Sequence, residues 1–177
     1  PGDLARAMNA YLALAPGLRP PTRPLEVYML ASPRQYAAAT RAFLEEQADA
    51  YVRLGEGGYT SRGRAVYRDL GRERTATLAA HEGWHQLTQA TFQEQLPVWL
   101  EEGIAALMEP AREIDIGGGA VRTPSPWARP PRLERLIRLH DEQRLLPISA
   151  FSRIRPTDLL DREESALDYY APAWGIA

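Results

Sequence analysis

The segment TATLAAHEGWHQLTQ, residues 75–89, contains His81, Glu82 and His85 in the spacing H-E-x-x-H. Residues four apart on an α-helix lie one above the other, so both imidazoles can point at one metal ion. Glu82 lies beside them, close enough to hold a water molecule on that ion. Zn²⁺ is the natural candidate for such ligands. The pattern therefore predicts a helix that carries two metal ligands and a carboxylate base.

A different interpretation places the two histidines in a packed core, where they form hydrogen bonds without a metal. A third ligand nearby separates the two interpretations, because a catalytic zinc keeps three protein ligands and one open position. The segment PVWLEEGIAALME, residues 97–109, offers two carboxylates, Glu101 and Glu102. Its apolar stripe does not choose between them, because both glutamates flank it.

His140 is the remaining histidine of the chain and an alternative third ligand. It belongs to residues 132–144, whose periodicity predicts a helix with Leu133, Leu136, Ile137 and His140 on its inner stripe. A histidine beside a leucine stripe is usually a packed or capping residue, which favours a glutamate as the third ligand.

The combination of HEGWH with WLEEGIA resembles the gluzincin branch of zinc metallopeptidases, in particular the peptidase-MA-like domains whose second helix reads W-L-x-E-G-x-A. In that pattern the glutamate directly before the glycine is the metal ligand. The resemblance thus implies one Zn²⁺ ion held by His81, His85 and Glu102, with Glu101 as a solvated neighbour or a contact of the ligands. It also implies a peptide or protein substrate.

The segment DYYAPAW, residues 168–174, carries a weaker part of the resemblance, to a Y-A-x-x-W stretch that follows the zinc helices in the same family. Many gluzincins use a downstream tyrosine or histidine to donate a hydrogen bond to the oxyanion, which implies Tyr170, with Tyr169 as the fallback. Pro172 kinks a helix or marks its first turn, so the sequence does not fix the direction in which the Tyr170 hydroxyl points. Core packing of Tyr170 is an equal alternative.

These residues together predict a zinc-dependent peptidase. The metal lowers the pKa of its water, and Glu82 takes the proton as the water attacks a carbonyl carbon, then passes it to the leaving amine. The alternative is a zinc-stabilised, non-catalytic binding module of a larger envelope protein. Glu82 argues against that module, because a structural zinc needs no general base. A metal-free helical domain is a further alternative.

The expected fold is α+β, a zincin-like domain with a small mixed sheet packed on the active-site helix and a mainly helical C-terminal part. We expect a lead-in helix and a proline-rich linker over residues 1–24 and the peptidase domain over residues 25–177. Residues 25–31 predict a strand buried on both faces, and residues 59–70 predict one or two strands with a bend at Gly63. By resemblance, Arg64–Arg68 is the sheet edge that binds substrate backbone; an ordinary edge strand is the alternative.

Other segments complete the expected organisation. Ser32 and Pro33 predict a helix start, and the helical pattern ends before Gly55. Residues 110–131 are rich in glycine and proline and predict a long irregular lid or rim, in which Trp127 pins its own loop or contacts substrate. Residues 146–160 predict short helical turns, and residues 163–176 predict the last helix.

Composition sets further bounds on function. The chain has 177 residues, of which 45% are hydrophobic and 25% charged, as expected of one globular domain. A net charge of −2 predicts no nucleic-acid partner, and no apolar run reaches the roughly 18 residues of a membrane span. The absence of cysteine excludes disulfides and thiolate ligands and is compatible with an extracytoplasmic location, periplasmic or secreted, which we favour. The abrupt ends predict a fragment, truncated at its C-terminus. Substrate preference and oligomeric state are not fixed by the sequence.

Overall fold

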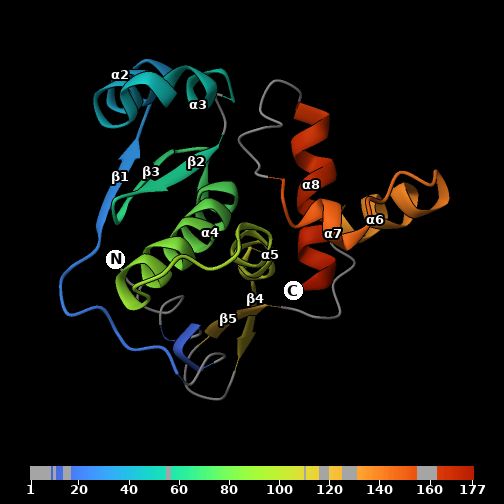
Figure 1. Ribbon diagram of the computed structural model, residues 1–177. Helices are drawn as coiled ribbons and strands as arrows, with labels where there is room; N and C mark the ends of the chain where they lie inside the picture. Colours follow the sequence, from blue (N-terminus) through green and yellow to red (C-terminus); the bar gives the residue numbers. More distant parts are fainter. Residues whose placement is uncertain are drawn as a thin grey trace.

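The structure is a computed structural model that describes residues 9, 11–13, 17–54, 57–109, 111–115, 120–124, 131–154 and 163–177 (Figure 1). It is an α+β fold, as predicted, with a three-stranded sheet near the N-terminal side and a mainly helical C-terminal part. In chain order the elements are β1 (Glu26–Leu30), α2 (Pro33–Leu44), the 3-10 helix η1 (Glu45–Gln47), α3 (Ala48–Leu54), β2 (Gly58–Ser61), β3 (Arg64–Arg68), α4 (Arg72–Thr91), α5 (Val98–Met108), β4 (Ala111–Asp115), β5 (Ala120–Pro124), α6 (Pro131–Asp141), α7 (Ile148–Phe151) and α8 (Glu163–Ile176).

The sheet has the strand order β1-β3-β2, with β3 parallel to β1 and antiparallel to β2. The prediction that residues 25–31 are buried on both faces is wrong, because β1 lies at an edge and exposes 37% of Tyr28 and 59% of Met29. An apolar run shows that a segment suits a strand but does not show how many neighbours the strand has.

The prediction that Arg64–Arg68 forms the sheet edge is also wrong. This segment is β3, the central strand, and its three middle residues are buried. The edge position was implied by the resemblance alone, and no pattern within one segment shows which strands pair on either side of it. The strand at the edge beside α4 is β2, which is joined to β3 by the predicted turn at Gly63, where φ is +75°.

Helices cover both faces of the sheet (Figure 1). On one face, α2 contributes Tyr36 to a cluster with Tyr59 and Val66, and the predicted start of α2 is confirmed because the Ser32 hydroxyl accepts a hydrogen bond from the Gln35 amide. The continuous helix expected up to Gly55 is interrupted, because Glu45 takes a φ of +49° and a 3-10 turn follows. The other face of the sheet packs on α4.

The predicted helix over residues 75–89 is confirmed within α4, whose residues 80–88 are all buried. Trp84 and Leu87 belong to the core. Gly83 does not mark a close approach of α5, because a Cβ there would meet only the Tyr11 ring at ordinary contact distance. The close approach lies at Gly103 of α5, where an added Cβ would collide with the Ala173 carbonyl oxygen of α8.

The C-terminal helices support α5 from the side opposite α4 (Figure 1). Helix α8 has the predicted bounds, and α6 packs against it with Leu136 beside Gly175, while Ile137 of the expected inner stripe is 52% exposed. Arg135 and Arg144 of the α6 region both pair with Asp168 of α8. These contacts hold α6 against α8, which in turn packs on α5, the second helix of the candidate site.

The connecting segments agree with the predictions only in part. The irregular connection expected over residues 110–131 contains the antiparallel hairpin β4–β5, while Trp127 lies outside the described residues. Residues 146–160 include the short helix α7, and most of the lead-in helix expected before residue 16 lies outside the described part of the chain. No helix among the described residues has the length and apolar character needed to cross a membrane.

Candidate metal centre

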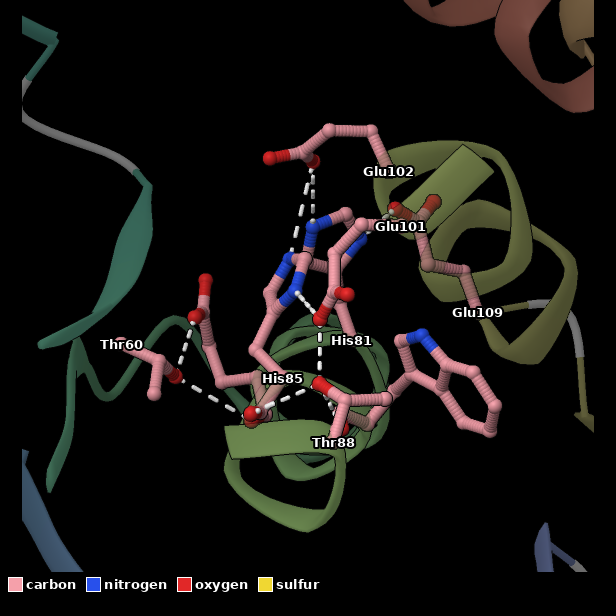
Figure 2. Close-up of polar contacts among 9 residues, drawn as sticks. Thr60, His81, His85, Thr88, Glu101, Glu102 and Glu109 are labelled. Carbon is pink, nitrogen blue, oxygen red and sulfur yellow. Dashed lines mark hydrogen bonds and ion pairs between the residues drawn. The ribbon is translucent and has the colours of Figure 1, made fainter. Parts of the chain in front are cut away.

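Three predicted ligands come together between α4 and α5 (Figure 2). Oε2 of Glu102 lies 3.3 Å from Nε2 of His81 and 3.6 Å from Nε2 of His85. A tetrahedral ion with bonds of about 2.0–2.1 Å separates its ligand atoms by about 3.3–3.4 Å. The spacing of the carboxylate from the two imidazoles therefore suits ligands of one ion.

The carboxylate of Glu102 supports the same fit. Its Oε2 is buried and makes no hydrogen bond, although two imidazole nitrogens lie close by. A buried carboxylate oxygen without a partner is costly. The three ligand atoms all lie within 4.8 Å of one another, and a cation among them would satisfy all three.

Two further carboxylates hold the outer nitrogens of the imidazoles. Nδ1 of His85 lies 3.0 Å from Glu101, and Nδ1 of His81 lies 2.7 Å from Glu109. A carboxylate at Nδ1 keeps the proton there and leaves Nε2 free to bind a metal. Glu101 is thus a contact of a ligand, one of its two predicted roles.

The same contacts determine the charge of the metal-free centre. Burial alone would lower the pKa of His85, but the carboxylates of Glu101 and Glu102 outweigh it and raise that pKa to about 9. For His81, the nearby carboxylates of Glu102 and Glu109 likewise outweigh burial and hold the pKa well above its ordinary value. Burial works to raise the pKa of Glu102, but the two imidazoles hold it well below its usual range. These contacts favour the protonated form of both imidazoles in the metal-free centre, and a metal ion would compete with those protons.

Glu82, the predicted base, lies beside the ligands and is 4% exposed. Its Oε2 accepts a hydrogen bond of 2.8 Å from the hydroxyl of Thr60 on β2. Its Oε1 lies against Gly58 of the same strand, where an added Cβ would sit only 3.0 Å away. Burial raises the pKa of the Glu82 carboxyl, which suits a group that must accept a proton near neutral pH.

The two candidate tyrosines of α8 have different surroundings. The ring of Tyr170 lies 6.1 Å from the His81 ring, and burial together with Glu102 and Glu82 raises its pKa well above the ordinary value. Tyr169 instead packs in the core against Phe151 at 4.9 Å. The structure thus brings Tyr170 beside His81 and places its fallback in a core cluster, against which Tyr170 also packs.

The alternative ligand His140 is excluded, because its side chain is 77% exposed and pairs with the neighbouring Asp141. Sequence reasoning missed Thr60, Glu109 and Arg132. Glu109 had a weak signal, since it follows Glu102 by two helical turns and so lies on the same face. Thr60 and Arg132 had none, because they reach the site from distant parts of the chain.

Residues 74–177 match the model of a family described as "Protein of unknown function (DUF1570)". The match covers more than half of the chain and includes α4, α5 and α8, so it contains the three candidate ligands and Tyr170. The chain belongs to this family. Neither the curated proteins nor the solved structures contain a significant match.

Proposed function

We propose that the chain is a zincin-like, zinc-dependent peptidase of the gluzincin type. The observation that carries the proposal is the convergence of His81, His85 and Glu102 on one point, with the buried carboxylate of Glu82 beside them. A site that served only to bind a structural ion would need no such carboxylate beside its three ligands. A Zn²⁺ ion at this point would supply Lewis acidity and lower the pKa of a bound water.

Glu82 is the proposed general base. One of its oxygens is held by Thr60, which fixes the plane of the carboxylate and leaves the other oxygen to accept a proton from the attacking water. The same carboxyl then delivers the proton to the amine that leaves when the peptide C–N bond breaks. The raised pKa of Glu82 favours this second step.

Strand β2 is the proposed contact for the substrate backbone. It has no second strand neighbour among the described residues, and it carries both groups that touch Glu82. A peptide that adds to this edge would place its carbonyl groups near the base. Tyr170 is proposed to donate a hydrogen bond from its phenol hydroxyl to the developing oxyanion, because its ring lies beside His81 and burial keeps the hydroxyl protonated.

Replacing the base while keeping the ligands tests this function. Glu82→Gln should retain one Zn²⁺ per chain by elemental analysis, whereas cleavage of a peptide library should fall by orders of magnitude. The library is digested by the wild type with and without a chelator to show that cleavage needs the metal. A wild-type protein that binds zinc and cleaves no peptide would favour the non-catalytic binding module.

A further inference from the structure

The imidazole of His85 is supported from within the α4–α5 pair. Its Nδ1 contacts Glu101 of α5, and the same oxygen of Glu101 is hydrogen-bonded to the hydroxyl of Thr88 on α4. Thr88 lies almost one helical turn after His85 on the same helix. The support of this ligand therefore needs no other part of the molecule.

The imidazole of His81 is supported differently. Its Nδ1 contacts Glu109, at the C-terminal end of α5, and the second oxygen of that carboxylate is ion-paired with Arg132 of α6. The side chains of Glu109 and Arg132 are 14% and 23% exposed. Removing one member of such a shielded pair leaves the other charge poorly compensated and free to change position.

Arg132 makes a second contact with the site. Its guanidinium lies over the ring of Tyr170, 6.0 Å from the ring centroid, and that ring in turn lies beside His81. A cation over an aromatic face restricts both groups. One arginine of α6 therefore contacts both the carboxylate that holds His81 and the aromatic ring beside it.

We propose that Arg132 is a positioning residue of the metal centre, which fixes Glu109 against His81 and so makes metal affinity depend on the packing of α6. The inference rests on the proposed function for the presence of the metal and for nothing else. Arg132 does not contact the ligands directly, so it acts through Glu109.

A matched pair of variants on α6 tests the proposal by Zn²⁺ affinity, measured in competition with a chromophoric chelator. Arg132→Met should weaken Zn²⁺ binding about 10- to 100-fold, the usual effect of losing a group that orients a ligand. Arg135→Met removes an arginine three residues later that is 20% exposed and paired at 2.6 Å with Asp168 of α8. It should lower the melting temperature of the protein but leave Zn²⁺ affinity near that of the wild type.

Three comparisons separate positioning from general damage to α6. In the Glu109→Gln background, Arg132→Met should cause little further loss of Zn²⁺ affinity, because the group through which it acts is already altered. Co²⁺ bound in place of Zn²⁺ should show altered visible absorption bands in Arg132→Met and unaltered bands in Arg135→Met. Arg132→Lys, which keeps the charge, should recover part of the affinity.

The outcomes separate this inference from the proposed function. The positioning role would be overturned if Arg132→Met kept the wild-type Zn²⁺ affinity, or if Arg135→Met lost as much Zn²⁺ affinity as Arg132→Met. Neither result would bear on the proposed peptidase activity. A wild-type protein that binds no Zn²⁺ would overturn both. Zinc binding that depends on Arg132 in a protein without peptidase activity would overturn only the proposed hydrolysis.

Discussion

The two sides of the candidate centre contact different groups, the base on one side and the metal ligands on the other. On the sheet side, β2 contacts only the base, through the Thr60 hydroxyl and the space left by Gly58. On the helical side, α5 supplies the ligand Glu102 and is itself held against α8 at Gly103. The difference suggests that metal binding and turnover can be altered separately, by changes on opposite sides of α4.

The largest expected effect is on the helical side. Glu102→Ala removes the carboxylate that joins the two imidazoles, so the variant should lose bound Zn²⁺ by elemental analysis and all metal-dependent hydrolysis with it. If the variant kept one Zn²⁺ per chain, the third ligand would have to be reassigned to Glu101, since His140 is far too exposed to take its place. Glu94→Ala, a change in the segment between α4 and α5, is the control and should keep the metal.

A change on the sheet side should instead lower turnover and leave Zn²⁺ binding intact. Thr60→Val keeps the shape of the side chain but removes the hydrogen bond to Glu82, a buried charged acceptor, at a cost of about 1–3 kcal/mol. We expect kcat on a cleaved peptide to fall about 10- to 100-fold. Zn²⁺ affinity should stay at the wild-type value, because Thr60 contacts no ligand in the structure. If this variant lost Zn²⁺ affinity together with turnover, the two sides of the centre would not control metal binding and turnover separately.

The helix contact at Gly103 gives a third test. A Cβ at this position would collide with the Ala173 carbonyl and lie 2.8 Å from Cβ of Ala177, so α8 must move away from α5. Gly103→Ala should lower the free energy of unfolding by about 1–3 kcal/mol, measured by denaturant titration, and weaken Zn²⁺ binding as well. Gly57→Ala is the matched control, because nothing lies within 4 Å of a Cβ there. Equal stability of the two variants would contradict the close packing of α5 on α8.

The two sides also differ in how far the sequence predicted them. The ligands were predictable because His81 and His85 are one helical turn apart and Glu102 stands in a second helix with a recognisable pattern. The α+β class followed from the resemblance. The bounds of α8 were predicted correctly, whereas the helix predicted over residues 75–89 is shorter at both ends than α4.

What supports the ligands and the base was not predictable. Thr60 and Arg132 act through tertiary contacts made by distant segments, and no local spacing encodes such contacts. The assignment of Arg64–Arg68 to the sheet edge, which the resemblance implied, failed for a related reason. Strand order depends on pairing between segments, while composition reports only whether a segment suits a strand. The long connection before α6 was assigned as irregular because its glycines and prolines concealed the β4–β5 hairpin.

The smallest expected effect concerns the pH dependence of the metal-free protein. Because the fold raises the pKa of His85 from its ordinary 6.5 to about 9, the protonated imidazole stabilises the folded state. This contribution is fully present below about pH 6.5 and is lost as the pH rises through about 9. The melting temperature measured with a chelator should therefore fall over this interval.

Bound Zn²⁺ should reverse the trend, because the metal needs neutral imidazoles and competes with their protons. The increase in melting temperature that Zn²⁺ causes should accordingly grow from pH 6.5 to 9. His140→Gln, at an exposed site that contacts neither side of the centre, should leave both curves unchanged. If the metal-free protein instead melted at a constant temperature across this range, the carboxylates would not be holding protons on the imidazoles. The ligands would then be free for metal at neutral pH without the release of protons that the structure implies.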